Sequence, residues 1–410
     1  MHWTILVLFN LYLVTGWMPR LSTIGGTDIG FGAVILALLL PLIVLAPGRA
    51  VVDDRAAAIR LLIIVSICFV IFWGFLGVYT VDQPQRAGRL FLSLGQGVVL
   101  ITLVTRTLSS KALRFSLMVC VIMLAANSLL SLIGFLGGDL QSLTYLQRDR
   151  SSGLFKNPNQ YGMIAAMATP FSVALFFQKG NAILATVILC LAFVGLLTAA
   201  SKTNLLIALM MVFATMAYGQ YSTGRVKTML VSLPVLCVIV WWGSMPVLER
   251  FNPRAAEIIQ SKLIERNAGN STLDQRFELW NYSLKVMQRS PMFGEGAGQR
   301  IMVADQDLSH SHNVFLDMGR TVGIPGMVGT TIFLIAIIWL AFKTLARVVA
   351  IPIELAAQMH GRAIIIGSGF AVLSYILSNQ MSDSLGPSTS IFFWLCTGLL
   401  LRRHDFLFDD

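Results

Sequence analysis

The segment S-H-S-H-N-V-F-L-D-M-G-R-T-V-G-I-P-G, from Ser309 to Gly326, joins a long polar stretch to a long apolar one. We interpret it as the place where the chain turns back into a membrane. A histidine at such a boundary can be half-buried in protein that water still reaches, so its ring titrates near neutral pH and can move a proton. His312 is therefore the first candidate for chemistry. The alternative is that His312 and Asn313 only cap the helix that follows.

The composition identifies the class of protein. Of the 410 residues, 56% are hydrophobic and only 12% are charged, a balance outside the range of soluble domains. Because a segment in lipid must satisfy its own backbone hydrogen bonds, apolar runs of about 17–20 residues predict spanning helices. The sequence therefore predicts an all-α, polytopic integral membrane protein with about twelve transmembrane helices, at residues 2–18, 30–46, 61–80, 90–105, 115–137, 159–178, 182–200, 203–219, 228–248, 322–342, 363–379 and 390–401.

These runs divide the chain into three parts. Residues 1–248 contain the first nine predicted helices, residues 249–320 form one long polar segment, and residues 321–410 contain the last three helices. The first run is followed by Pro19 and Arg20 and not by a small-residue cleavage site. We therefore expect the first helix to be retained and not removed as a signal peptide.

The distribution of Lys and Arg predicts the orientation. Short loops on one side of the predicted membrane hold twice as many of these residues as short loops on the other side, which places both termini in the cytoplasm and the segment 249–320 outside. The net charge of +10 then reflects this topology. We accordingly expect no nucleic-acid partner.

The outward segment contains two predicted amphipathic helices that lie over the outer face of the bundle. Asn252 and Pro253 suit the start of the first helix, and its apolar side carries Ile258, Ile259 and Leu263. The second helix is expected to start near Ser271 or Thr272, where the spacing is that of a capping box, and to end at Pro291. Its apolar residues recur at helical intervals: Phe277, Trp280, Leu284 and Met287.

Two further patterns in this segment leave alternatives open. Gly294, Gly296 and Gly298 permit the close approach of a ligand, although such clusters are common in plain turns and this one lacks the strand and the lysine of a phosphate-binding loop. Carboxylates and imidazoles could also bind a divalent ion through Asp305, Asp307, His310 and His312. Acidic residues in an exposed loop are usually solvated, so we expect no metal and no organic cofactor.

A family resemblance rests on the spacing around the histidine. His312 and Asn313 are followed, after nine residues, by Gly323 and Gly326. This matches the pattern His-[Asn/Ser/Gln]-x9-Gly-x-x-Gly of the O-antigen ligase family, whose relatives include O-antigen polymerases and some bacterial protein O-oligosaccharyltransferases. Further stretches resemble family motifs: R-S-S-G-L-F-K-N-P-N-Q-Y-G from Arg150 to Gly162, L-L-T-A-A-S-K-T from Leu196 to Thr203, and R-F-E-L-W through P-M-F-G-E-G-A-G from Arg276 to Gly298.

The resemblance implies a membrane glycosyltransferase of the GT-C type in a bacterial inner membrane. Its donor would be a glycan on undecaprenyl diphosphate, and its acceptor a sugar hydroxyl of lipid A core at the periplasmic face. Displacement at the anomeric carbon needs a base for the acceptor hydroxyl and cations for the departing diphosphate. Direct attack of this kind would need no metal and would invert the anomeric configuration.

The resemblance also assigns roles to residues. His312 would be the base, Arg276 and Lys202 would grip the diphosphate, and Asn313 would orient the histidine. Asn313 is also a substrate-binding candidate, and further candidates near the same rim are Arg150, Arg300 and Arg320.

The cations have simpler interpretations beside these roles. Lys202 can snorkel at the end of a span, and it departs from the family, in which many members have arginine at this position. Arg150 can pair with Asp149. A positive charge near the start of a helix is unfavourable for the helix, so Arg276 favours a functional explanation.

Three functions are compatible with the sequence. The first is ligation of finished O-antigen to lipid A core, the second is polymerisation of lipid-linked repeats or transfer to another acceptor, and the third is export of a lipid-linked glycan without catalysis. The predicted spans carry no formal charge away from their ends and show no repeated half, which disfavours a transporter. The spacing after His312 favours the ligase.

Overall fold

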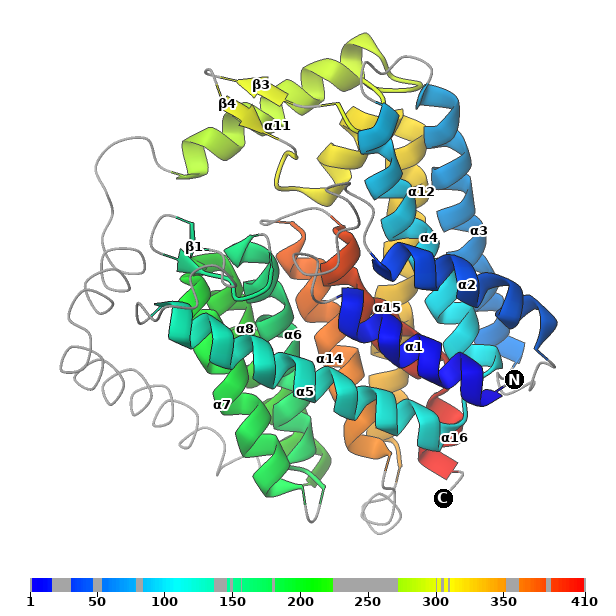
Figure 1. Cartoon of the computed structure of the whole chain (residues 1–410), viewed down its shortest axis with the longest axis vertical. Helices are drawn as coiled ribbons and strands as arrows, with labels where there is room; N and C mark the ends of the chain where they lie inside the picture. Colours follow the sequence, from blue (N-terminus) through cyan, green and yellow to red (C-terminus); the bar gives the residue numbers. More distant parts are fainter. Residues whose placement is uncertain are drawn as a thin grey trace.

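The computed structural model describes residues 2–16, 31–46, 54–78, 84–135, 146–147, 150–155, 157–178, 181–223, 272–299, 301–303, 306–308, 310–351, 361–380 and 385–408. Within these residues the chain forms 13 helices and two short antiparallel hairpins (Figure 1). The first eight helices are α1 (His2–Gly16), α2 (Phe31–Leu45), α3 (Asp54–Gly77), α4 (Pro84–Arg106), α5 (Ser110–Phe135), α6 (Pro158–Leu175), α7 (Ala182–Ala199) and α8 (Lys202–Thr223). The remaining elements are α11 (Thr272–Arg289), α12 (Val314–Val349), α14 (Arg362–Ser378), α15 (Pro387–Leu401) and α16 (Arg403–Phe408), with hairpins β1–β2 (Leu146–Gln147, Arg150–Ser151) and β3–β4 (Ile301–Val303, Gln306–Leu308).

The predicted class of polytopic membrane protein is confirmed. Eleven of the predicted spans coincide with helices, whereas the run 228–248 and the first predicted amphipathic helix lie outside the described residues. Five helices are long and apolar enough to cross a bilayer, namely Ala56–Gly77, Ser110–Phe135, Ala182–Ala199, Lys202–Gly219 and Val314–Val349. Shorter apolar helices accompany them at His2–Gly16, Phe31–Leu45, Leu90–Arg106, Arg362–Ser378 and Ser388–Leu401.

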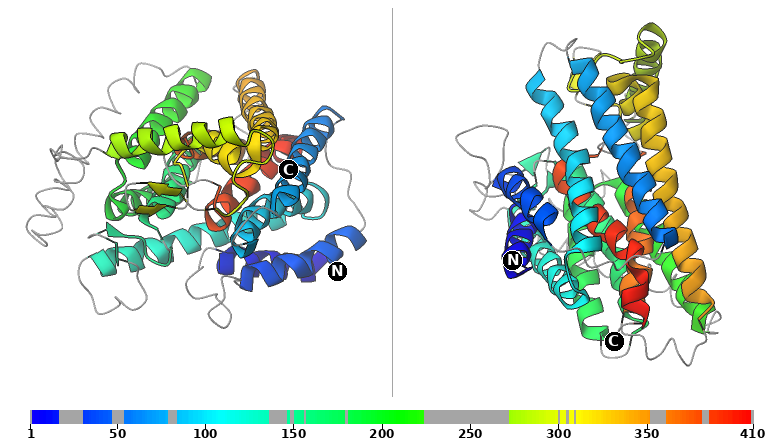
Figure 2. Two further views of the ribbon diagram at one scale, coloured as in Figure 1. Left: turned by 90° about the horizontal axis from the view of Figure 1, so that it is seen from above. Right: turned by 90° about the vertical axis from the view of Figure 1, so that its right-hand side faces the viewer.

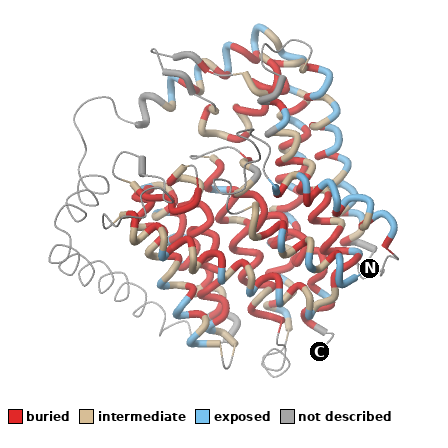
Figure 3. The backbone as a smooth tube through the Cα atoms, viewed as in Figure 1, coloured by how far each residue is buried: buried red, intermediate tan, exposed pale blue. Residues whose placement is uncertain are grey.

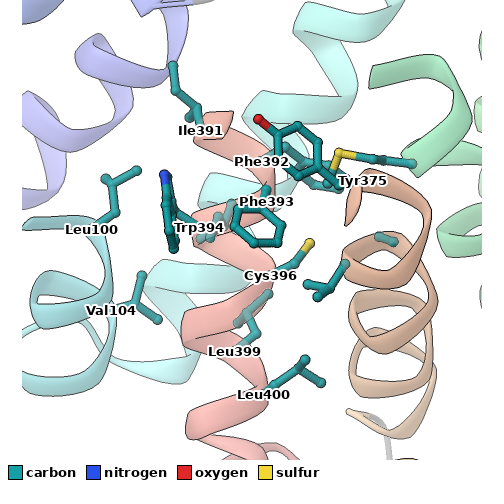
Figure 4. Close-up of a cluster of buried hydrophobic side chains, with 14 of the residues drawn as sticks. Leu100, Val104, Tyr375, Ile391, Phe392, Phe393, Trp394, Cys396, Leu399 and Leu400 are labelled. Atoms are coloured by element: carbon teal, nitrogen blue, oxygen red, sulfur yellow. The ribbon is translucent and has the colours of Figure 1, made fainter. Parts of the chain in front are cut away.

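Helix α15 lies in the centre of the bundle, where the chain is most deeply buried (Figure 3). Trp394 and Phe393 are fully buried, and the Phe393 ring stacks on Tyr375 of α14 with centroids 4.5 Å apart (Figure 4). Gly97 of α4 makes room for the Trp394 indole, since a Cβ there would overlap that ring. Small residues of this kind let helices in a membrane approach closely enough for van der Waals packing to hold them.

The contacts of α6 and α14 define the two ends of the bundle. The Ser374 hydroxyl of α14 donates to Ala166 O of α6 at 2.9 Å, and Gly367 packs on Phe171. The helices are thus antiparallel, so α6 begins beside the end of α14.

The starts of α8 and α12 lie at that same end, which we call the upper end, as it is drawn in Figure 1. Asn204 near the start of α8 donates from Nδ2 to Asn159 O of α6 at 3.1 Å. Val314, the first residue of α12, donates from its backbone N–H to Asn379 O at the end of α14, also at 3.1 Å.

The lower end is closed by the C-terminal helix α16. The Arg402 guanidinium is buried, donates to Val104 O at 3.0 Å and forms an ion pair with Asp405. Gly361, just before α14, lies against the backbone carbonyl of Phe406. His404 of α16 is exposed.

Helix α12 corrects one sequence prediction. The predicted span began at Val322, but the helix begins at Val314 and is interrupted at Gly323, whose φ of 79° and ψ of 178° are not helical. Pro325 follows, and its missing N–H and its ring both oppose a continuous helix. Hydropathy alone therefore identified the long apolar segment after the kink and missed the shorter helical segment before it.

The kink exchanges hydrogen bonds with the loop that follows α11. In an unbroken helix the Ile324 N–H would donate to Arg320 O, four residues earlier. Here Ile324 N–H donates to Pro291 O at 2.8 Å, and Arg320 O accepts instead from Glu295 N–H at 2.8 Å. The loop 290–299 thus satisfies both backbone groups that the kink releases.

Two glycines make this contact possible. Gly294 has a φ of 64° and lies against Arg320 O, while Gly323 lies against Met292 O. A Cβ at either position would overlap the opposing carbonyl, and both backbones are in the left-handed region that favours glycine. The stretch from Pro291 to Gly294 and the stretch from Gly323 to Gly326 each supply one of the two glycines of this backbone contact.

Helix α11 was predicted correctly in extent and only in part in its buried face. It begins at Thr272 and ends at Arg289, close to the predicted limits. Of the predicted stripe, Met287 is buried and Trp280 half-buried, whereas Phe277 and Leu284 are exposed. Leu279 and Val286, outside that stripe, are buried as well. The helix packs on the first part of α12, where Met287 contacts Gly319.

Replacing Gly323 with alanine tests the kink. Because alanine at this position combines an unfavourable backbone conformation with overlap of Met292 O, we expect Gly323→Ala to destabilise the protein by about 1–3 kcal/mol or more. Gly88→Ala in α4 is the matched control, since nothing lies within 4 Å of a Cβ there. Thermal unfolding in detergent should show a lower Tm for Gly323→Ala only, and an unchanged Tm would contradict this account of the kink.

Candidate active site

His312 lies in the link between β4 and α12 and has an unusual backbone. Its φ is 56°, in the left-handed region, and the residue is half-buried. Side chains other than glycine adopt this conformation at a cost of roughly 1–2 kcal/mol, so surrounding contacts must stabilise it. Its ring lies edge-on to that of His310, with centroids 4.4 Å apart.

Ser311, immediately before His312, is fully buried and uses every polar group it has. Its N–H donates to Asp317 Oδ1 at 3.2 Å, its hydroxyl donates to Asn313 O at 3.1 Å, and its carbonyl accepts from Trp280 Nε1 at 3.1 Å. The backbone immediately before His312 is thus held by hydrogen bonds with Asp317 of α12 and Trp280 of α11.

Asn313, immediately after His312, is the N-cap of α12. Its backbone is extended, and its Oδ1 accepts from the N–H groups of Phe315 and Leu316, each at 3.1 Å. This is the ordinary geometry of an asparagine cap. The cap occupies the side-chain oxygen, so a substrate contact by Asn313, which stays a prediction, would come from its amide nitrogen.

Arg320 was predicted among the substrate-binding cations, and its surroundings are internal. The side chain is fully buried and contacts Glu295 at 3.1 Å, Asp317 at 3.0 Å and Gln299 O at 3.0 Å. These contacts hold the loop 290–299 on α12. A direct contact of Arg320 with substrate is not needed to explain its position, and that role stays untested.

Glu295 links this cluster to α11. It accepts a hydrogen bond from the Tyr282 hydroxyl in addition to its ion pair with Arg320. Burial, reinforced by the hydrogen bond and the charge of Glu295, raises the pKa of Tyr282 to about 12. The phenol therefore stays protonated and serves as a donor at neutral pH.

Arg276 occupies α11, one helical turn before Trp280. It is half-buried, and burial lowers the pKa of its guanidinium from the usual value. Because an arginine starts from so high a pKa, the group stays a cation at neutral pH. Phe277 lies edge-on to Trp280, with centroids 5.4 Å apart.

Arg300, another predicted cation, lies outside the described residues.

Lys202 is the first residue of α8 and is exposed. The turn before it contains Ala200, with a φ of 44°, which ends α7 in the left-handed conformation. A lysine at the start of a helix adds its charge to the backbone N–H groups of the first turn, which also attract anions. The position therefore suits the binding of a phosphate group.

Arg150 is tied to the same turn. Its Nε donates to Ala199 O at 2.6 Å, and its Nη2 donates to Asn159 Oδ1 at 2.7 Å. Asn127 of α5 holds the following loop by accepting from Leu154 N–H at 2.8 Å. The predicted partner Asp149 lies outside the described residues. Two of the donors of Arg150 are thus used to hold backbone and the start of α6.

The structure brings the predicted residues to one end of the bundle. Lys202 and Arg150 lie at the starts of α8 and α6, and His312 precedes the start of α12; all three starts are at the upper end. Helix α11, which carries Arg276, extends across this end (Figures 1 and 2). That a single ligand bridges His312, Arg276 and Lys202 stays a prediction.

Sequence reasoning missed the residues that support His312. Trp280 was identified only as part of an apolar stripe, and Ser311, Asp317 and Glu295 were given no role. One signal was present: Asp317 and Arg320 are spaced to pair on a helix, in a segment that leads into a span. Of the four proposed metal ligands, Asp305 lies outside the described residues, and no group of three His, Cys, Asp or Glu suited to a metal occurs within them.

Comparison with known families gives a match to part of this chain. Residues 184–331 match the family described as O-antigen ligase. The matched region includes Lys202, Arg276 and His312, together with the kink at Gly323. A search among curated proteins finds no match to the chain.

Asn313 offers a test of capping against substrate binding. Because Asp and Ser accept the same backbone hydrogen bonds, Asn313→Asp and Asn313→Ser should retain most of the thermal stability, whereas Asn313→Ala should lose about 1 kcal/mol. Thermal unfolding of the three variants in detergent measures this order. Equal stability of all three would contradict the cap as the main role of Asn313.

Proposed function

Because residues 184–331 form an O-antigen ligase domain, we propose that this chain transfers a glycan from undecaprenyl diphosphate to a sugar hydroxyl of lipid A core. The family supports transfer of lipid-linked glycans in general, and the acceptor is the specific part of the proposal. The setting would be a bacterial inner membrane, with a GT-C-type bundle of about twelve spans. Residues 249–320 would form a periplasmic segment between membrane parts 1–248 and 321–410.

In the proposed reaction His312 removes the proton of the acceptor hydroxyl. The acceptor oxygen attacks the anomeric carbon of the donor, and the bond from that carbon to the diphosphate oxygen breaks. Attack opposite the leaving group inverts the anomeric configuration. Arg276 and Lys202 stabilise the negative charge of the departing undecaprenyl diphosphate, with Arg150 as a further cation.

The observation that carries this proposal is the strained, buttressed backbone of His312 at the end of the bundle that also carries the cations. Strained residues that neighbouring contacts hold in place are concentrated at functional sites. A histidine serving only to introduce a helix would not need the left-handed conformation, since Asn313 already caps α12.

The proposed orientation places the upper end of the bundle at the periplasmic face. His312 lies at the upper end and α16 at the lower end, so an upper end facing the periplasm puts the C-terminal helix on the cytoplasmic side. The Lys and Arg bias of the short loops supports the same orientation. Membrane lipids would surround the exposed apolar residues of the outer helices, such as Phe72, Phe115 and Trp339.

A second candidate shares the same chemistry. The family includes polymerases, in which the acceptor is the glycan of another lipid-linked molecule, so the match supports this alternative as well. Both reactions use the same base and the same diphosphate grip. Export without catalysis is less well supported, because it gives no reason for a buttressed imidazole.

Reconstitution tests the role of His312. With purified lipid-linked glycan and lipid A core in EDTA-containing buffer, we expect product from the native protein and a loss of about 10²-fold or more in kcat/KM for His312→Ala. His404→Ala, at the opposite end of the bundle, is the matched control and should keep full activity. Full activity of His312→Ala would contradict the assignment of the base, and loss of native activity in EDTA would restore the metal alternative.

The acceptor is tested in the same system by substitution of the lipid A core with a second lipid-linked glycan. Lengthened lipid-linked glycan, with no product on lipid A core, would show a polymerase and overturn the ligase assignment.

The diphosphate grip is tested on α11, which offers a matched pair of arginines. Loss of one charge-assisted contact should raise the donor KM about tenfold or more for Arg276→Ala. Arg289→Ala, exposed at the end of the same helix, should leave the donor KM unchanged. Equal effects of the two variants would show that only the general charge of α11 matters.

A further inference from the structure

We propose that Trp280, Asp317, Arg320 and Glu295 act through Ser311 as a positioning relay that holds His312 in its reactive orientation. The inference rests on the proposed function, because it assigns these residues to the support of the base. None of them needs to touch the substrate.

The first arm of the relay runs along α12. Arg320 donates to Asp317 Oδ1 at 3.0 Å, and the same oxygen accepts from Ser311 N–H at 3.2 Å. Arg320 is fully buried and Asp317 is nearly so, so both charges rely on these partners. A carboxylate fixed by a buried guanidinium thus fixes the residue before His312.

Glu295 extends this arm to the loop 290–299. It neutralises Arg320 from the loop side at 3.1 Å, while its own N–H is bound by Arg320 O at the kink. The loop, the kink and the base are therefore coupled through a single arginine.

The second arm comes from α11. Trp280 Nε1 donates to Ser311 O at 3.1 Å, and Trp280 is four residues after Arg276. Residues four apart lie on the same face of a helix. This hydrogen bond therefore sets the position of His312 relative to the cation proposed to bind the diphosphate.

Both arms end on the backbone of one residue, since Ser311 is held at its N–H and at its carbonyl. With Asn313 fixed as the cap, His312 is the only residue between two anchored neighbours. Its left-handed φ is the conformation that this double anchorage imposes.

Trp280→Phe removes the indole N–H and keeps an aromatic ring in place. We expect kcat to fall at least tenfold, with the donor KM unchanged within twofold. In the His312→Ala background, Trp280→Phe should cause no further loss, because a residue that acts through His312 has nothing left to position. A similar loss in both backgrounds, or an unchanged kcat in the native background, would overturn the relay.

The matched control is Tyr218→Phe in α8. Tyr218 is also half-buried and donates from its hydroxyl to a carbonyl, that of Leu345 at 2.6 Å in the part of α12 after the kink, so its loss removes one hydrogen bond outside the relay. The two variants should lower the apparent Tm to a similar extent, and only Trp280→Phe should lower kcat. Equal losses of kcat would show that general destabilisation, and not positioning, explains the effect.

A second measurement does not depend on turnover. The rate at which diethyl pyrocarbonate modifies His312, followed by mass spectrometry, should change at least threefold in Trp280→Phe and stay unchanged in Tyr218→Phe. The same rate in all three proteins would overturn the relay. Native protein that is inactive with every glycan pair tested would instead contradict the proposed function, and the modification rates would still decide the relay.

Discussion

The arrangement of this protein around its candidate site depends on a broken turn of one helix. At Gly323 the helix α12 releases one backbone acceptor and one donor, and both are taken by the loop 290–299. A buried backbone group without a partner costs about 1–3 kcal/mol, so the kink is stable only while the loop is in place. The exchange also requires two backbones to approach each other directly, which only the glycines at positions 294 and 323 permit.

This constraint carries over to the chemistry because the kink separates two parts of α12. The part after Gly323 is the long apolar helix, and the part before it carries Asp317, Arg320 and the capped start next to His312. The loop that completes the kink also supplies Glu295, which neutralises Arg320. The backbone immediately before His312 is thus held by contacts from α12, which the loop supports through Arg320, and from α11.

The sequence predicted the membrane class, most of the helices and the candidate histidine, because these depend on local composition and on spacing. It did not predict where α12 begins. Hydropathy counts Asp317 and Arg320 as two separate charges, whereas in the fold they neutralise each other and become buried. The same limit applies to the surroundings of Arg320: a sequence shows that a cation is present, but only the fold shows that Glu295 and Asp317 contact it.

The buried face of α11 illustrates a second limit. Of the predicted apolar stripe, Trp280 and Met287 face α12, whereas Phe277 and Leu284 are exposed. Periodicity predicts that a helix has an apolar side, but it does not predict how much of that side the neighbouring helix covers.

The two non-glycine residues with positive φ among the described residues are His312 and Ala200, and both adjoin candidate functional groups. Their surroundings follow the same physical scheme. On one side, buried Arg320 holds Asp317 and through it the backbone before His312. On the other, Arg150 holds the carbonyl of Ala199, directly before Ala200, in the turn that presents Lys202.

An arginine suits such a role because its several donors have a fixed geometry and its charge persists when it is buried. The neighbouring residue is then free of that structural task. If Lys202 binds the diphosphate as proposed, Arg150 already fixes the turn, and the lysine needs a charge at the right place more than it needs a rigid fork. The strained backbones at Ala200 and His312 are therefore each flanked by an arginine that is itself held by hydrogen bonds within the protein.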